Sequence, residues 1–241
     1  MKKLIIICNG KSLEDFSFKS IDRKKYDIIT IGLSFRYFNK INFYPDYYVN
    51  VDSVCEKMVE RDICKLIKND KVKRVLLTSS CLWSDESLKI ITKFKKKVDI
   101  MENIQKVNFL PFKYMKTVSS GSCAVLYGML LGYTSLHILG ADQDYKEMLI
   151  QSKKRPDGTL EITSPIKVNP NYFFNDYQRE GDVYNKPNGN PGHHKRAWEE
   201  VKQISRIIEI LHNIKISIVN YNTKYSLSDL FNTFKYEELF S

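Results

Sequence analysis

Short apolar runs separated by longer stretches constrain the fold of this chain most strongly. Such runs recur along the sequence, at residues 4–7, 26–31, 47–51, 74–78, 136–139 and 215–219. Strands that are apolar on both faces are typical of a parallel sheet with helices on both sides. The chain is therefore predicted to be an α/β protein built on a single Rossmann-like parallel sheet.

The stretches between these runs supply the predicted helices. Residues 54–68 carry apolar side chains at helical spacing. Residues 122–131 are small and apolar almost all round, as expected of a helix buried against the sheet. Ser119 or Ser120 is suited to cap the N-terminus of that helix, and Gly132 to end it in the left-handed conformation. A chain of 241 residues fits one domain of this kind, alone or with a long insertion.

Residues 143–192 differ in composition from the rest of the chain. They contain few aliphatic runs and many Pro, Gly, Asn and Tyr residues. So long a stretch without regular structure is typical of a lid or binding loop, and a disordered insertion is the alternative. The aromatic residues 172–174 argue against disorder. We expect residues 1–142 and 193–241 to form a nucleotide-binding α/β domain, with 143–192 as a lid or acceptor-side insertion.

The charge balance is basic, with 38 Lys and Arg against 28 Asp and Glu, a net charge of +10. This suits an anionic membrane surface, a nucleic acid or a phosphate-bearing substrate, or simply a Lys-rich solvated surface. The basic clusters at 65–74 and 93–97 lack interleaved aromatic or Gly-Arg repeats, so no nucleic-acid partner is expected. The first apolar run is too short for a signal peptide, and nothing approaches a membrane span. We expect a cytoplasmic protein.

The C-terminal segment from Ser226 carries apolar residues at i, i+3 and i+4 spacing. These residues are Leu227, Leu230, Phe231 and Phe234. The spacing predicts an amphipathic helix, either lying at a membrane interface or packed onto the sheet. Acidic residues in the same segment oppose anionic lipid and favour packing onto the sheet.

Polar loops follow the predicted strands at the edge where open α/β sheets bind ligands. Asn9, Gly10 and Ser12 follow the first strand, without a Walker or G-x-G-x-x-G pattern. Ser120 and Gly121 open the buried helix, where backbone N–H groups can hold an anion, or where Ser120 is an ordinary cap. We expect the Asn9 loop and this helix start to lie side by side in one site.

Two further motifs carry candidate chemistry. His193 and His194 follow a Gly-rich turn, and an imidazole can accept a proton from a hydroxyl near neutral pH. Adjacent histidines point apart, so they are not expected to share a metal. Asp142 and Asp144 form a D-x-D pair, which can hold a divalent metal, although Asp142 can equally cap a turn. No metal site is expected.

Taken together, these motifs resemble the bacterial lipooligosaccharide sialyltransferases of glycosyltransferase family 42. The resemblance is densest in residues 1–13, 119–145 and 192–210, and the spacing from Gly121 to Gly132 is its most specific part. It implies a GT-A-like Rossmann fold with a lid. It also implies inverting transfer of sialic acid, or a related nonulosonate, from a CMP-activated donor to a surface-glycan acceptor, without metal or other cofactor.

The resemblance also implies roles for individual residues. It places the donor against Asn9, Gly10, Ser12, Asn50, Ser120 and Gly121. We expect Asp142 to contact the donor as well. The resemblance makes His193 the general base and gives the leaving phosphate the hydroxyl of Tyr145; the hydroxyl of Tyr172 is the alternative that we expect from the Tyr-rich insertion. The sequence departs from the family at Gly32, near which an asparagine is expected, and at Thr117, where the family has arginine.

The implied partners are a nucleotide sugar and an oligosaccharide or lipid-linked glycan. An anionic membrane surface at the inner face of the cell membrane and a homo-oligomer are compatible with this interpretation. Two alternatives stay open: another nucleotide-dependent transferase, or a non-enzymatic basic protein that binds RNA or membrane.

Overall fold

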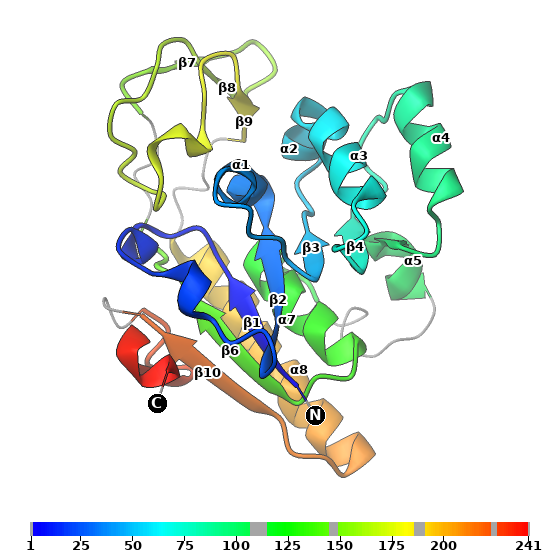
Figure 1. Cartoon of the computed structure of the whole chain (residues 1–241), viewed down its shortest axis with the longest axis vertical. Helices are drawn as coiled ribbons and strands as arrows, with labels where there is room; N and C mark the ends of the chain where they lie inside the picture. The colour runs from blue at the N-terminus through cyan, green and yellow to red at the C-terminus, as the bar shows by residue number, and fades with distance from the viewer. Residues whose placement is uncertain (1, 107–114, 145–148, 186–190, 223–225, 241) are drawn as a thin grey trace.

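The computed structural model describes residues 2–106, 115–144, 149–185, 191–222 and 226–240 (Figure 1). An eight-stranded parallel sheet forms its centre, in the order β11-β10-β6-β1-β2-β3-β4-β5. The strands are β1 (Lys3–Ile7), β2 (Tyr26–Ile31), β3 (Tyr47–Val49), β4 (Arg74–Leu77), β5 (Val98–Ile100), β6 (Ser135–Leu139), β10 (Ser217–Tyr221) and β11 (Asn232–Phe234). The predicted α/β class and parallel sheet are confirmed.

The first strand lies where the order of the sheet reverses. β1 pairs with β2 on one side and with β6 on the other, so the chain builds one half of the sheet and then returns to build the other. Loops on either side of such a reversal diverge at the carboxyl edge and leave a crevice between them. The crevice in this fold is therefore expected beside the end of β1.

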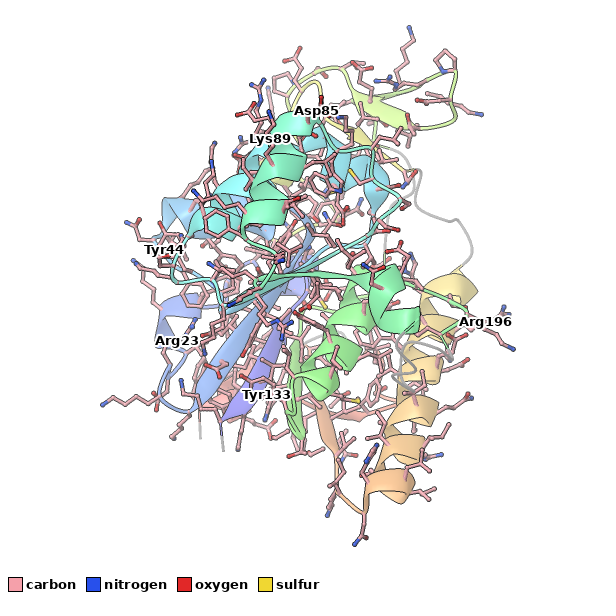
Figure 2. All side chains as sticks on the ribbon, turned by 90° about the vertical axis from the view of Figure 1, so that its right-hand side faces the viewer. Arg23, Tyr44, Asp85, Lys89, Tyr133 and Arg196 are labelled. Carbon is pink, nitrogen blue, oxygen red and sulfur yellow. The ribbon has the colours of Figure 1, made fainter. Side chains whose placement is uncertain are left out.

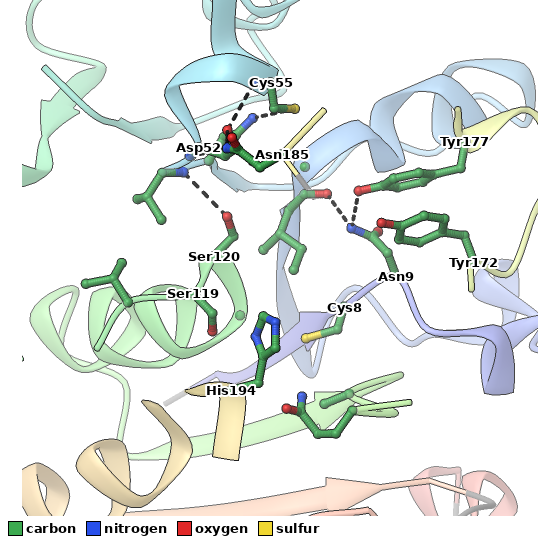
Figure 3. A pocket seen from close by; sticks show the side chains of 18 of the residues that line it. Cys8, Asn9, Asp52, Cys55, Ser119, Ser120, Tyr172, Tyr177, Asn185 and His194 are labelled. Atoms are coloured by element: carbon green, nitrogen blue, oxygen red, sulfur yellow. Dashed lines mark hydrogen bonds between the residues drawn. The ribbon is translucent and has the colours of Figure 1, made fainter. Parts of the chain in front are cut away.

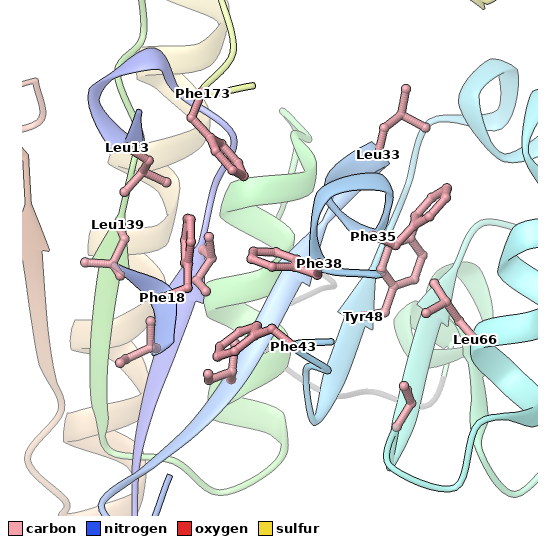
Figure 4. Close-up of a cluster of buried hydrophobic side chains, with 14 of the residues drawn as sticks. Leu13, Phe18, Leu33, Phe35, Phe38, Phe43, Tyr48, Leu66, Leu139 and Phe173 are labelled. Atoms are coloured by element: carbon pink, nitrogen blue, oxygen red, sulfur yellow. The ribbon is translucent and has the colours of Figure 1, made fainter. Parts of the chain in front are cut away.

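Helices cover both faces of the sheet, which explains why β1 is apolar and buried from Leu4 to Ile7. The helices are α1 (Phe35–Lys40), α2 (Ser53–Met58), α3 (Glu60–Lys68), α4 (Asp85–Lys93), α5 (Met101–Lys106), α7 (Ser120–Leu130) and α8 (Pro191–His212). Leu4 and Ile6 belong to a cluster with α7 and α8, whereas Ile5 and Ile7 belong to a cluster with α1 and α3 (Figure 4). Figure 2 shows Arg196 of α8 projecting away from the sheet into solvent.

The buried helix α7 forms as the sequence predicts. Ser119 is its N-cap, and the side chains of Ser119 and Ser122 each accept a hydrogen bond from the backbone N–H of the other. Gly132 follows the helix with a φ of +90°, in the left-handed region. Gly128 lets α7 approach the sheet, because a Cβ at that position would lie 2.5 Å from the side chain of Leu4.

Two predicted helices take other forms. The helix expected over 54–68 is divided into α2 and α3, because Val59 leaves the helical region at φ −113° and ψ 24° and buries its side chain. The tail forms β11 and a 3-10 turn over Tyr236–Leu239 instead of the predicted amphipathic helix. Leu227 has a φ of +66°, which a continuous helix does not allow, and β11 instead pairs with β10.

The insertion contains a small antiparallel sheet, where the sequence predicted no regular structure. Its strands are β7 (Ser152–Lys154), β8 (Leu160–Ile162) and β9 (Val183–Tyr184). Figure 1 shows this sheet at the top of the molecule, near α1. The long helix α8 follows the insertion and begins at Pro191. Within the described part of the chain, no helix has the length and apolar character needed to cross a membrane.

Candidate active site

A cavity of about 430 Å³ opens at the carboxyl edge of β1, β2 and β3, beside the first turns of α7 and α8 (Figure 3). Segments far apart in the sequence contribute to its lining: Asn9, Asn50, Ser120, Tyr172 and His194. The predicted juxtaposition of the first-strand loop and the α7 N-terminus is confirmed. A Cβ added at Gly121 would lie 3.2 Å from the Cys8 sulfur and 3.0 Å from the Trp198 ring.

Asn9 is the central residue of the first-strand loop. Its Nδ2 donates to the carbonyl of Ile31, at 3.1 Å, and to the hydroxyl of Tyr177, at 3.0 Å. Its Oδ1 is buried and accepts no hydrogen bond from the described residues. A buried, unsatisfied amide oxygen that lines a cavity is available to a donor group on a ligand.

Gly32, near which the sequence resemblance led us to expect an asparagine, makes room for Tyr177. Gly32 has a φ of +56°, and a Cβ there would lie 2.6 Å from the Tyr177 hydroxyl. That hydroxyl accepts a hydrogen bond from the backbone N–H of Leu33 as well as from Asn9. A tyrosine from the insertion thus occupies the space beside Gly32.

Asn50 holds the loop after β3 in place. Its Nδ2 donates to the hydroxyl of Tyr48 and to the Cys55 sulfur, and its Oδ1 accepts from the backbone N–H of Asp52. The side chain of Asn50 is buried, yet the residue lines the cavity. The neighbouring N–H of Val51 donates to the hydroxyl of Ser120 at 3.4 Å, which ties this loop to the start of α7.

The start of α7 presents two unused backbone donors. The N–H groups of Ser120 and Gly121 find no acceptor among the residues that the structure describes, whereas the Ser122 N–H is capped by Ser119. These free N–H groups and the helix dipole favour a negative charge at this point. None of the described lining residues is Lys or Arg, so an anion in the cavity would rely on donors such as these backbone N–H groups.

Ser12, Gly10 and Asp142 meet one another outside the described lining of the cavity. Asp142 accepts from both the N–H and the hydroxyl of Ser12, and from the amide of Asn222. A Cβ on Gly10 would lie 2.4 Å from the Asp142 carboxyl carbon, so glycine is required for this approach. The Tyr236 hydroxyl lies 2.8 Å from that of Ser12. These contacts join the ends of β1 and β6 to the C-terminal segment, and the predicted donor contacts stay predictions.

The structure places only some of the predicted catalytic residues at the cavity. His194 lines the cavity, whereas His193 lies in the first turn of α8 with its side chain outside the described part. Tyr145 lies outside the described residues. Tyr172 lines the cavity and stacks on Tyr177, with ring centroids 3.7 Å apart. Among the described residues, no group of three or more His, Cys, Asp or Glu side chains could hold a metal ion.

Two cysteines line the cavity, and both are held in the thiol form. Burial raises the pKa of Cys8 to about 12, with the charge of Asp142 adding to the effect. Burial also raises the pKa of Cys55 to about 12, and the nearby Asp52 carboxylate adds to that rise. Because a thiolate is the nucleophilic form, neither side chain is suited to covalent catalysis at neutral pH.

The insertion is fixed to α1 by buried charges. Arg36 and Asp182 are both largely buried and form a bidentate ion pair, and Arg36 also donates to the Tyr177 carbonyl at 2.8 Å. At the surface, Lys40 pairs with Asp176 at 2.8 Å. These contacts hold Tyr177 in the cavity wall.

Sequence reasoning missed several lining residues, among them Asp52, Tyr177, Asn185 and Trp198. Asp52 carried a signal, since an acidic residue just before a predicted helix is typical of a helix cap. Tyr177 and Asn185 carried none, because only the docking of the insertion brings them to the cavity.

The fold of this chain is similar to that of known proteins, although its sequence is not. No family model and no curated protein sequence matches the chain. Solved structures do match, and they show that the chain has a fold similar to that of sialyltransferases. The Rossmann-like, GT-A-like fold implied by the sequence motifs is therefore confirmed.

The individual structures are bacterial. The sialyltransferase CstII from Campylobacter jejuni, in complex with the substrate analogue CMP-3FNeuAc, matches with a TM-score of 0.58 and 15% identity, over 97% of this chain and 86% of that one. The monofunctional α-2,3-sialyltransferase Cst-I from the same organism matches with a TM-score of 0.53 and 14% identity, over 96% and 79%. CstII with a trisaccharide acceptor and CMP also matches with a TM-score of 0.53 and 14% identity, over 96% and 86%.

Proposed function

We propose that this chain is a glycosyltransferase that moves sialic acid, or a related nonulosonate, from a CMP-activated donor to a glycan acceptor. The observation that carries the proposal is the cavity itself. Asn9, Asn50, Ser120 and Gly121, to which the family resemblance gives donor contacts, come from separate loops and line that one cavity. The fold is also that of sialyltransferases whose structures hold CMP, CMP-3FNeuAc or a trisaccharide acceptor.

The α7 start is suited to the donor phosphate. As the bond between the anomeric carbon and the phosphate oxygen breaks, negative charge grows on the leaving CMP. The free N–H groups of Ser120 and Gly121 and the hydroxyl of Tyr172 are the donors proposed to stabilise it. Preorganised dipoles of this kind act without reorganisation during the reaction.

The histidine pair at the start of α8 supplies the general base. The imidazole accepts the proton of the acceptor hydroxyl while the acceptor oxygen bonds to the anomeric carbon from the face opposite the phosphate, so the configuration inverts. His193 holds this role by resemblance, and His194 lines the cavity. Removal of the true base is expected to lower kcat by 10²- to 10⁴-fold while CMP binding is retained. Single His193→Ala and His194→Ala variants identify which histidine acts.

No metal has a role in this scheme. We therefore expect transfer and CMP binding to persist in EDTA, because helix dipoles and hydroxyl groups stabilise the phosphate instead. Loss of activity in EDTA that Mg²⁺ or Mn²⁺ restores would overturn metal independence.

The proposed acceptor is a lipid-linked glycan, reached at an anionic membrane surface by the basic clusters. In the 65–74 cluster, Lys73 pairs with Asp27 and Arg74 with Asp99, so these two side chains contribute less free charge than the sequence suggests. We expect salt-sensitive binding to anionic liposomes. Equal binding to neutral and anionic vesicles would exclude charge as the cause.

One experiment tests the function as a whole. The purified chain is screened by thermal shift with CMP, CDP, UDP, GDP and S-adenosylmethionine, and then assayed for CMP release from CMP-sialic acid with and without oligosaccharide acceptors. We expect CMP to raise Tm by the largest amount and acceptor to accelerate CMP release. Stabilisation by S-adenosylmethionine or GDP alone would favour another transferase. Steeply salt-dependent oligonucleotide binding without CMP binding would favour the RNA-binding alternative.

A further inference from the structure

We propose that Asp52 recognises the ribose of the donor nucleotide by accepting hydrogen bonds from its vicinal 2′- and 3′-hydroxyl groups. This inference rests on the proposed function, because it concerns the nucleotide part of the same donor. It adds a specificity-determining residue that discriminates ribonucleotides from deoxyribonucleotides.

The first observation is the chemical character of the cavity wall. Asp52 is the one acidic side chain among the described residues that line the cavity. Its Oδ1 accepts from the N–H groups of Val54 and Cys55, at 3.0 and 3.1 Å, and from the amide of Asn185, at 2.9 Å. Its Oδ2 accepts from none of the described residues, so one carboxylate oxygen is available to a ligand that carries hydroxyl donors.

The second observation is the division of charge within the cavity. A carboxylate repels phosphate, whereas the free N–H groups of Ser120 and Gly121 attract it. The anionic end of the nucleotide is therefore directed to the start of α7, and a neutral, hydroxyl-bearing part to Asp52. Figure 3 shows Asp52 beside Asn185 at one end of the view and His194 at the other.

The third observation is the position of Asp52 in the fold. It follows β3 at the carboxyl edge of a parallel sheet, three residues after the strand ends at Val49. In dinucleotide-binding folds, an acidic residue near the carboxyl edge accepts from a ribose hydroxyl for the same electrostatic reason. Asn50 Oδ1 accepts the Asp52 backbone N–H at 3.1 Å and fixes the backbone there, and the bonds to Oδ1 hold the carboxylate.

Asp52 can be replaced by residues that keep the N-terminal cap of α2. Asp52 caps α2, and both Asn and Ser are good capping residues, so Asp52→Asn and Asp52→Ser are expected to fold. The Asn side chain keeps one acceptor oxygen but loses the charge, and Ser is too short to keep the same reach. Asp157→Asn is the matched control, because Asp157 also accepts a backbone N–H, from Thr159, in an exposed turn outside the cavity lining.

The measurement is the ratio of the Kd for 2′-deoxy-CMP to the Kd for CMP, by calorimetry on the full chain. We expect the natural chain and Asp157→Asn to prefer CMP by roughly tenfold or more, as is usual for a hydrogen bond to a charged group. Asp52→Ser should lower this ratio to about 1–2 by weakening CMP alone, and Asp52→Asn should give an intermediate ratio.

The outcomes separate the two proposals. CMP binding with an undiminished ratio in both Asp52 variants overturns the ribose role and leaves the proposed function standing. That result would be expected if Asp52 contacted hydroxyl groups of the transferred sugar instead. Absence of CMP binding by the natural chain overturns the proposed function, and the ribose role with it.

Discussion

Glu56 is expected to make the stability of this protein fall as the pH rises. The side chain lies on α2 and is completely buried. Its Oε1 accepts the N–H of Thr78 at 2.9 Å, and its Oε2 has no partner among the described residues. Burial raises the pKa of Glu56 from 4.5 to about 9; the Thr78 hydrogen bond opposes this rise, and the charges of Asp52 and Glu102 add to it.

The sign and size of the effect follow from proton linkage. The folded pKa lies above the unfolded one, so between pH 4.5 and about 9 the folded chain holds a proton that the unfolded chain has lost. The contribution of Glu56 is therefore fully present below pH 4.5 and is lost as the pH rises toward 9. The loss is about 1.4 kcal/mol per pH unit, or about 3 kcal/mol at pH 7.

Glu56→Gln isolates this contribution. The glutamine carbonyl can still accept the Thr78 N–H and does not ionise, so the variant should match the natural chain near pH 5 and exceed its free energy of unfolding at pH 8. Urea unfolding at half-unit steps from pH 5 to 8.5 measures the difference. Glu86→Gln, on the exposed first turn of α4, is the control. Parallel pH profiles for the natural chain and Glu56→Gln would refute the reasoning.

Three further substitutions test contacts that hold the loops near the cavity in place. Gly10→Ala forces a methyl group against Asp142 and should lower the free energy of unfolding, measured in urea, by about 1–3 kcal/mol. An unchanged value would show that the loop moves aside without loss of stability. Arg36→Met leaves Asp182 buried and unpaired and should cost about 3–5 kcal/mol, partly recovered in Arg36→Met/Asp182→Leu; a double variant no better than the single would contradict this. Tyr177→Phe leaves two buried N–H donors without their acceptor, so it should cost about 1–3 kcal/mol and weaken CMP binding by calorimetry; full affinity would show that the Tyr177 hydroxyl does not support the nucleotide site.

The parts of the fold that could be predicted from the sequence are those fixed by the composition of a short segment or by a single residue. The strand at residues 4–7 and the helix α7 are apolar on every face, and only an element buried between layers needs that composition. Ser119 and Gly132 mark the ends of α7 through capping and left-handed backbone, which are properties of single residues. The Asn9 loop and the α7 start could be placed together because the ends of parallel strands share an edge.

The parts that sequence missed depend on tertiary contacts. Val59 fits a helical pattern by type, yet its backbone leaves the helical region while its side chain joins the buried core. The tail has helical spacing, but its backbone pairs with β10 along one sheet edge. Tyr177 reaches Asn9 across 168 residues, a pairing that no local pattern carries.

The bond between Asn9 and Tyr177 has a consequence for synthesis of the chain. At about 5–20 residues per second, a ribosome needs on the order of 10 to 30 s to add the 168 residues that separate them. During that interval the loop after β1 lacks the bridge from Gly10 to Tyr172 as well as the Tyr177 hydroxyl. The strands β1 to β5 emerge before the binding cavity is complete, so a ligand that needs the whole cavity cannot assist the early steps of their folding.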